Sequence, residues 1–394
     1  MNVQSVRFPL FDSLRAIAAL SIFFFHIAFV LHLLGGRTLS PWLAQLNVGV
    51  PIFFLISGFL LYRPFAQTRF SGDPPPETVP YFIRRIFRIV PAYWVALTIV
   101  AVWLDLHDVF TASGVGTYYG FFQVYRHSTV TGGIGPAWTI DTEIAFYILL
   151  PIWAFLLRRI RFRGVAGFAR SEGALLGVLF VGGFLAKLIA VHNTPFHPLT
   201  LPAVLYTLPA YLDYFAIGMG LAVASVALAG RDDAGFVRVI DRAPWLPVAV
   251  GAFAFYLLGT HIGPLGHGWG TEFMWQHYLK AVVGIGLLLP AIFGDPARGF
   301  VRRVLGNRAL LWLGMISYAF YLWHLAILTK LDRSGLAESV GGVAFTIIGF
   351  ACTTAVAAAS WYLVERHALR LGRKLAQRSE RRIEPAASAP VRAG

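Results

Sequence analysis

The chain has 394 residues, of which 57% are hydrophobic and only 13% are charged. This composition, with a mean hydropathy of +0.66, excludes an ordinary soluble domain and predicts an all-α polytopic membrane protein. The formal net charge of +14 would indicate nucleic-acid binding in a soluble chain, but here it has to be compared with membrane topology first. The single cysteine, Cys352, excludes an intramolecular disulfide.

Apolar segments long enough to cross a bilayer, about 20 residues each, recur ten times along the chain. They are residues 10–34, 44–62, 88–104, 138–157, 174–191, 203–228, 245–260, 274–293, 309–328 and 341–364. The first segment lacks the cleavage site of a signal peptide, so we expect it to remain in the mature protein.

The positive charges follow the topology that ten spans would give. If both termini are cytoplasmic, 26 of the 33 Lys and Arg residues lie in cytoplasmic segments and 4 in outer loops. The positive-inside rule then predicts a multi-pass protein of the plasma (inner) membrane with both termini in the cytoplasm. Nucleic acid is not needed to explain the charge. We expect an integral membrane domain over residues 1–370 and a basic, disordered cytoplasmic tail over 371–394.

The first segment carries two ionisable residues, Arg15 and His26, eleven positions apart. Helical geometry places them on nearly the same face, about 16 Å apart along the axis. Ionisable groups inside a span usually face the bundle interior and indicate a functional site. The alternatives are a snorkelling arginine paired with Asp12 and a histidine that bridges two helices by packing.

Other spans hold ionisable groups at a similar predicted depth. Asp141 and Glu143 lie in the first turn and a half of the fourth span. A carboxylate beside a histidine orients the imidazole for proton abstraction, and the estimated depth places Glu143 near His26. Asp141 has the alternative of a plain interfacial residue.

In the ninth span, Ser317, Tyr321 and His324 share one helix face. For His324 we favour an aromatic-belt or packing role beside Trp323. The role of Asp213 in the sixth span stays open. The remaining outer histidines match no standard zinc pattern and are interpreted as solvated: His192, His197, His261, His267 and His277.

At the start of the third span, Arg85 and Arg88 are three residues apart and therefore share a face. Paired guanidiniums suit a polyphosphate, which they can bind in a bidentate manner. The alternative is ordinary cytoplasmic charge in contact with anionic lipid headgroups.

Several segments together resemble one known family, and they occur in its order over nearly the whole chain. They are FDSLRAIAALSIFFFHI, VGVPIFFLISGFLL, RRIFRIVPAYW, AWTIDTEIAFYILLP, LGMISYAFYLWH and WYLVERH. The chain is similar in these segments to the acyltransferase 3 family of integral membrane enzymes, which acylate surface polysaccharides, peptidoglycan, lipids and some antibiotics.

The resemblance implies ten core helices and an acyl-CoA donor, such as acetyl-CoA, that is taken from the cytoplasm without a metal ion. The acyl group would pass to a hydroxyl of a carbohydrate or lipid-linked acceptor. Arg15 and His26 would be an essential pair with His26 as the base, Arg85 and Arg88 would bind the donor, and Glu143 would be the acidic residue of the site.

The chain departs from the family pattern at three positions. Thr139 stands where serine is usual, Asp141 is an additional acid, and His367 replaces a proline. Two other functions remain open from the residues alone. Buried charges on several helices also describe a transporter or flippase, and a binding or sensing protein could keep the same scaffold.

Overall fold

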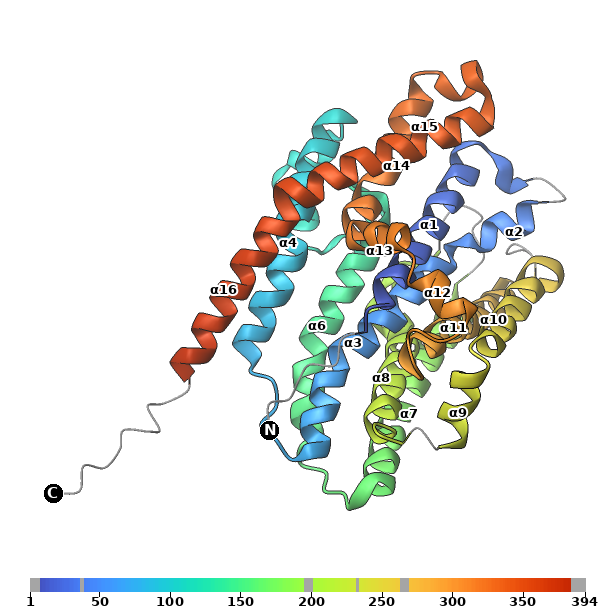
Figure 1. Ribbon diagram of the computed structural model, residues 1–394. Helices are drawn as coiled ribbons and strands as arrows, with labels where there is room; N and C mark the ends of the chain where they lie inside the picture. The colour runs from blue at the N-terminus through green and yellow to red at the C-terminus, as the bar shows by residue number, and fades with distance from the viewer. Residues whose placement is uncertain (1–7, 36–38, 195–200, 232–233, 263–268, 384–394) are drawn as a thin grey trace.

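The computed structural model describes residues 8–35, 39–194, 201–231, 234–262 and 269–383. Within these ranges the chain forms helices and turns without a β-strand. The long helices pack into one bundle, and α16 extends from it beside α4 (Figure 1). The prediction of an all-α polytopic protein is therefore confirmed.

Each of the ten predicted segments contains helix. The helices are α1 (Phe11–Val30), α3 (Gly49–Ser71), α4 (Thr78–Trp103), α6 (Trp138–Leu157), α7 (Gly164–Asn193), α8 (Leu212–Ala227), α10 (Trp245–Leu257), α11 (Trp269–Ile292), the pair α13 (Arg308–Met315) and α14 (Ser317–Arg333), and α15 (Leu336–Ser360). The other helices are α2 (Ser40–Ala44), α5 (Ala112–Gly114), α9 (Gly235–Arg242), α12 (Phe300–Leu305) and α16 (Arg366–Ile383).

Fewer than ten of these helices have the length and composition of a membrane span. Among the described residues there are eight such stretches, and the pair α13–α14, bent by 73°, makes a ninth. The remaining predicted span, 274–293, corresponds to α11, whose apolar run is interrupted by Gln276, His277 and Lys280. The protein is a multi-pass membrane protein, and a tenth crossing by α11 stays a prediction.

Helix α16 corrects the expectation of a disordered tail from residue 371. The helix continues to Ile383 because one of its faces packs on α4: Ala376 is buried, and Gly372 lies against Phe87. Residues 384–394 of the predicted tail lie outside the described residues.

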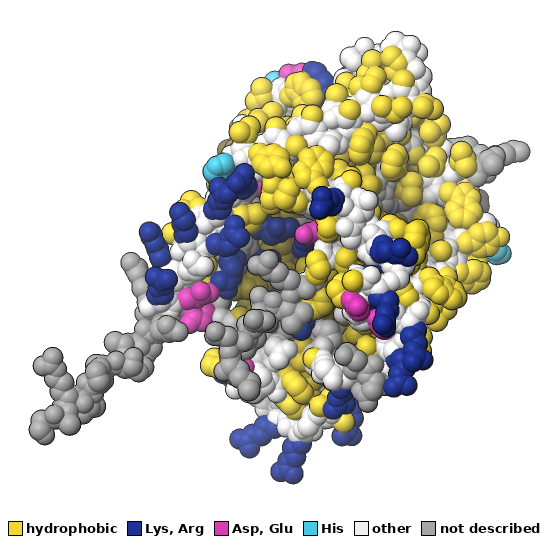
Figure 2. Space-filling view, in the orientation of Figure 1, with side chains coloured by type: hydrophobic (Ala, Val, Ile, Leu, Met, Phe, Trp, Pro, Cys, Tyr) yellow, Lys and Arg dark blue, Asp and Glu magenta, His cyan; other side chains and the backbone are white. Residues whose placement is uncertain are grey.

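Positive charge gathers at one end of the bundle, which we call the basic end. It is formed by the connections from α3 to α4, from α6 to α7 and from α8 to α9 (Figure 1). Figure 2 shows Lys and Arg side chains along α16 and the lower edge of the molecule, next to a broad hydrophobic surface. A surface of this kind is typical of helices that face lipid.

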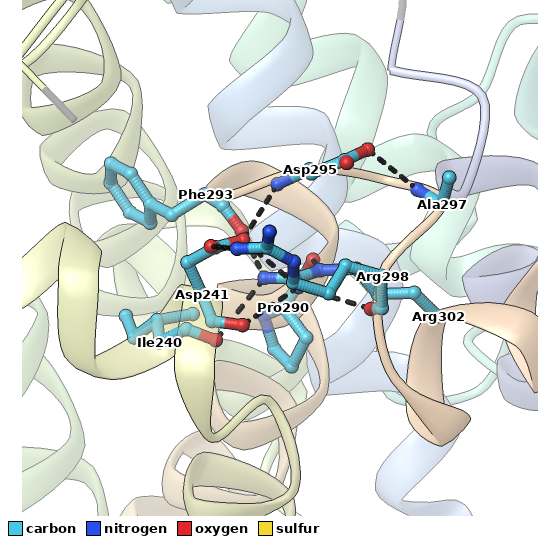
Figure 3. A network of polar contacts seen from close by, with 8 residues as sticks. All are labelled: Ile240, Asp241, Pro290, Phe293, Asp295, Ala297, Arg298 and Arg302. Atoms are coloured by element: carbon cyan, nitrogen blue, oxygen red, sulfur yellow. Dashed lines mark hydrogen bonds and ion pairs between the residues drawn. The ribbon is translucent and has the colours of Figure 1, made fainter.

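The network around Arg302 ties α9 and α11 to α12 (Figure 3). The fully buried guanidinium of Arg302 donates to the carbonyl oxygens of Pro290 at 2.9 Å and Phe293 at 2.6 Å, and lies 3.4 Å from Asp241 Oδ1. The backbone N–H of Asp295 donates to Asp241 at 2.9 Å and holds the pKa of that carboxyl below its usual range. Stability from this contact is present at neutral pH and is lost as pH falls through the lowered pKa.

The long loop between α4 and α6 is fixed on the side of α4. The Tyr93 hydroxyl donates to the carbonyl oxygen of Tyr118 at 3.0 Å, and the Trp94 indole N–H donates to that of Tyr119 at 3.0 Å. Gln123 and Val124, farther along the loop, are buried. The loop is thus a packed part of the bundle at the end opposite the basic end.

Candidate active site

A cavity of about 550 Å³ lies between α1, α3, α4, α6, α14 and α16. Aromatic and aliphatic side chains form most of its wall. Six arginines also line it: Arg15, Arg84, Arg85, Arg88, Arg366 and Arg373. Away from α16 it reaches Phe53, Thr139 and Tyr321. The cavity therefore joins a strongly cationic region to an apolar interior.

Arg15 lines this cavity and also forms the ion pair with Asp12 that the sequence offered as the alternative to a functional role. Its guanidinium donates to Asp12 Oδ1 at 2.7 Å, one helical turn away on α1. The charges of Arg88 and Glu143 lie close enough to act on it. The Arg15 guanidinium thus pairs with Asp12 and lines the cavity at the same time.

Arg85 and Arg88 both line the cavity, as their shared helix face predicts. They lie inside α4 rather than at its entry, because α4 begins at Thr78, ten residues before the predicted span. The Arg85 guanidinium lies 5.9 Å from the centre of the Tyr147 ring, and its Nε is buried without a hydrogen-bond partner among the described groups. A buried N–H of this kind is costly unless a ligand accepts it.

Glu143 lines the same cavity and accepts a hydrogen bond from the Ser57 hydroxyl. Its carboxylate lies near the charges of Arg15 and Arg88. We expected His26 to lie near Glu143 rather than near the arginine cluster; Glu143 shares the cavity with the arginines, and His26 does not line it. Depth along two helices does not determine which way their faces turn, and α6 directs Glu143 toward α3 and α4.

His26 lies outside the cavity lining and contacts His324 instead. His26 Nδ1 is 3.0 Å from His324 Nε2, and the two ring centres are 4.8 Å apart. His324 is 1% exposed, which contradicts the aromatic-belt half of the expectation and agrees with its packing half. Tyr321, whose ring centre is 5.6 Å from that of His324, lines the cavity. Tyr321 therefore lies between the cavity and the histidine pair.

The hydrogen bonds of this pair assign its tautomers. His324 Nδ1 is 2.7 Å from the carbonyl oxygen of Tyr321, which can only accept, so Nδ1 carries the proton. In the neutral pair His324 Nε2 is then the acceptor, and His26 must donate from Nδ1. The lone pair of His26 is left at Nε2, which is the atom a general base would use.

The predicted face of α14 is present, but its residues have different neighbours: two line the cavity, and the third contacts His26. Ser317 and Tyr321 line the cavity. The Tyr321 hydroxyl donates to the carbonyl oxygen of Pro136 at 2.7 Å and lies 2.9 Å from the Thr139 hydroxyl. Thr139, where the family usually has serine, thus supplies a hydroxyl in the same place. His324, one turn beyond Tyr321, turns to His26.

Asp141 is more than an interfacial residue, because its side chain is 3% exposed. The backbone N–H groups of the buried loop residues Gln123 and Val124 face its carboxylate. The position is thus a packed contact between α6 and the loop, outside the cavity.

A second buried group, centred on Asp213, was missed from the sequence. Lys187 Nζ donates to Asp213 Oδ2 at 2.5 Å, and His277 Nε2 lies 3.0 Å from the same atom. His277 stacks on Tyr214 with ring centres 3.9 Å apart. The interpretation of His277 as solvated is wrong because α11 turns it into the bundle. The sequence did contain a signal for this group, because Lys187 and Asp213 are opposite charges in two successive apolar segments.

Because this ion pair is fully buried, removing one partner leaves an uncompensated charge. Lys187→Met should lower the free energy of unfolding by about 3–5 kcal/mol, and Lys187→Met with Asp213→Asn should recover part of it. Arg298→Met, at an exposed ion pair, is the control and should cost at most about 1 kcal/mol. Thermal unfolding in nanodiscs measures all three, and equal losses from Lys187→Met and the control would contradict a structural role.

Two other outer histidines, His192 and His261, are exposed, while His197 and His267 lie outside the described residues. Within the ranges that the structure covers, no three His, Cys, Asp or Glu side chains are grouped so that they could hold a metal ion.

The fold and the cavity define a multi-pass membrane protein with an arginine-rich chamber inside its bundle. The family model described as an acyltransferase domain matches residues 9–362. The chain belongs to this family, acyltransferase 3, and is a membrane O-acyltransferase. The match decides against the transporter as the main interpretation.

Several named relatives extend over most of the chain. Exopolysaccharide production protein ExoZ of Rhizobium meliloti is 28% identical over 332 residues, covering 82% of this chain and 90% of the relative. Nodulation protein 10 of Rhizobium leguminosarum bv. viciae is 24% identical, covering 93% and 95%. Peptidoglycan O-acetyltransferase OatA of Listeria monocytogenes is 22% identical, covering 91% of this chain and 55% of its own length. No solved structure matches the chain.

Proposed function

We propose that this O-acyltransferase moves a short acyl group, such as acetyl, from acyl-CoA to a hydroxyl of a carbohydrate or lipid-linked acceptor. The observation that supports acyl-CoA as the donor is the cavity, which is lined by six arginines and by an apolar interior. The proposed acceptor rests on the relatives, whose names refer to exopolysaccharide production and to peptidoglycan O-acetylation.

The residues of the cavity fit the donor. Arg85 and Arg88 present guanidiniums on one face of α4, and the unpartnered Nε of Arg85 has an N–H to offer a phosphate oxygen. Arg15 and Glu143 lie beside them and would position the donor. The aromatic wall toward Phe53 suits the uncharged pantetheine arm and acyl group.

His26 would act as the base for the acceptor hydroxyl. The hydroxyl oxygen attacks the thioester carbonyl carbon while its proton passes to His26 Nε2. The C–S bond breaks, and the thiol of CoA leaves with that proton. Two acceptors, the carbonyl oxygen of Ile22 and His324 Nε2, lie 3.0 Å from His26 Nδ1 and hold the imidazole in the tautomer that leaves Nε2 free. Because Tyr321 separates the histidine pair from the cavity, its side chain has to move aside in each turnover.

The proposed orientation places the basic end and both termini in the cytoplasm, since 26 of 33 Lys and Arg residues then lie inside. Acyl-CoA would enter from that side of the plasma membrane. Reporter fusions after residues 165 and 265 should give opposite sides, with residue 165 in the cytoplasm. The same side for both would reject the topology.

Purified protein in lipid vesicles, supplied with radiolabelled acetyl-CoA and a panel of polysaccharide, peptidoglycan and lipid-linked sugar acceptors, tests the proposal directly. We expect label in one acceptor class and release of an equal amount of free CoA thiol. Failure to bind or consume acyl-CoA with every acceptor would overturn the proposed donor.

A further inference from the structure

Helix α16 contributes two arginines to the cavity, which the sequence analysis counted only as cytoplasmic positive charge. Arg366 and Arg373 are seven residues apart, which places them two turns apart on one helix face. Leu369 and Gly372, which lie between them, line the same cavity. The face of α16 that carries these arginines is therefore part of the cavity wall.

Close packing holds α16 in this position. A Cβ at Gly372 would come within 2.5 Å of Phe87 Cβ, so only glycine allows this approach to α4. Arg84 on α4 donates to Glu380 on α16 at 2.7 Å. Figure 1 shows α16 running beside α4 toward the basic end. Arg366 and Arg373 are thus held at the cavity by a packed helix.

The charges around the cavity are strongly unbalanced. Two of its six arginines already have partners: Arg15 pairs with Asp12, and Arg84 pairs with Glu380. Each of these ion pairs is 2.7 Å long. Neither guanidinium therefore carries a full uncompensated charge toward the cavity.

The other four arginines make no ion pair within the part of the chain that the structure describes: Arg85, Arg88, Arg366 and Arg373. Among the described lining residues Glu143 is the one carboxylate. Arg85 and Arg88 are only partly exposed, so their guanidiniums repel one another unless an anion neutralises them, and Glu143 and the buried Glu365 are the described carboxylates near them. Arg366 and Arg373 are exposed, so solvent screens their charge, but they add two further donors for a ligand with several negative charges.

We propose that Arg366 and Arg373 form a second phosphate subsite, which binds a phosphomonoester, while Arg85 and Arg88 hold a diphosphate. This inference rests on the proposed function. A CoA-type donor carries two charges on its diphosphate and about 1.5–2 on its 3′-phosphate, which matches two pairs of arginines. The deeper pair suits the diphosphate, from which the pantetheine arm continues inward. The pair on α16, with exposed side chains, suits the nucleoside end.

The test compares two donors that differ only in the monoester, CoA and 3′-dephospho-CoA. Full-length protein in zwitterionic nanodiscs should bind CoA more tightly. In Arg366→Gln/Arg373→Gln the Kd for CoA should rise about tenfold to 150-fold, the worth of one charge-assisted contact. The Kd for 3′-dephospho-CoA should change less than about twofold, so the preference for CoA disappears.

Arg370→Gln/Lys374→Gln is the matched control, because it removes the same charge from the same helix at positions that do not line the cavity. If both double variants weakened CoA binding equally, the effect would be general electrostatic attraction, and the proposed subsite would be overturned. Arg366→Lys/Arg373→Lys, which keeps the charge, should retain part of the preference and shows that α16 is still in place.

A phosphomonoester could also come from a lipid headgroup such as phosphatidic acid. Nanodiscs containing phosphatidic acid separate the two sources. Two results together would assign the subsite to lipid. Phosphatidic acid would reduce CoA binding in the wild type but not in Arg366→Gln/Arg373→Gln, and the wild type would not discriminate CoA from 3′-dephospho-CoA.

A wild type that binds neither nucleotide overturns the proposed function itself. A double variant whose Kd for CoA equals that of the wild type overturns only the subsite.

Discussion

His26→Ala should lower turnover by about 10² to 10⁴-fold, the usual contribution of a general base. His26 does not line the donor cavity, so its loss should leave the Kd for acyl-CoA within about twofold of wild type. The measurement is acceptor-dependent release of CoA thiol under saturating donor, together with a separate donor-binding titration. A proportional loss of binding and turnover would point to a folding defect instead.

His26→Gln separates hydrogen bonding from proton transfer. Glutamine can still donate to His324 Nε2 across the 3.0 Å contact, but it cannot accept a proton at useful pH. We expect it to be as inactive as His26→Ala. His261→Gln, at an exposed histidine, is the matched control and should keep full turnover. Near-normal turnover in His26→Gln would show that the histidine is structural, and the proposed mechanism would be abandoned.

His324 acts through His26, so its variants should show a different pattern. In His324→Gln the amide oxygen can still accept from His26 Nδ1, whereas in His324→Ala that N–H keeps only the carbonyl oxygen of Ile22, 3.0 Å away, as its acceptor. Turnover should therefore fall less with glutamine than with alanine, while the KM for donor changes little in either. Identical losses in both variants, with equal loss of thermal stability, would reduce His324 to packing.

Helix periodicity predicted which residues share a face, and this part of the site was recovered from sequence. Arg85 and Arg88 line one cavity, and Ser317 and Tyr321, about one helical turn apart on α14, line it too. Periodicity does not state which neighbour a face meets, because each helix can rotate about its own axis. The contact between His26 and His324 joins positions 298 residues apart and depends on how α1 and α14 pack.

The misplaced residues share one physical cause. The depth of Glu143 along α6 did not show that this helix turns it into the cavity that the arginines line. His277 was assigned to solvent because its spacing matched no zinc pattern, although a carboxylate on α8 draws it inward. The arginines of α16 were counted as topology, although Gly372 lets their helix close on α4. In each case the partner lies on another helix, and single-segment reasoning does not include it.

Arg85→Ala and Arg88→Ala should each weaken binding of acyl-CoA by about 1.5–3 kcal/mol, the worth of a charge-assisted hydrogen bond. Since both guanidiniums line one cavity, the double variant should lose more than either single one. Lysine at either position should restore only part of the affinity, because an ammonium cannot bind phosphate in a bidentate manner. Isothermal titration of the purified protein with acetyl-CoA measures each step.

The control is Arg303→Ala, which removes a charge from an exposed position on α12 outside the cavity. It should change donor affinity less than about twofold at physiological salt, where surface charges more than about 8 Å apart are largely screened.

We also expect Arg85→Ala to leave the stability of the ligand-free protein unchanged. The buried Nε of Arg85 has no partner among the described groups, so Arg85→Ala removes an unsatisfied donor and should not lower the melting temperature of the ligand-free protein. If the double variant binds acetyl-CoA as tightly as Arg303→Ala does, the pair serves lipid contact or topology, and the donor has to bind elsewhere.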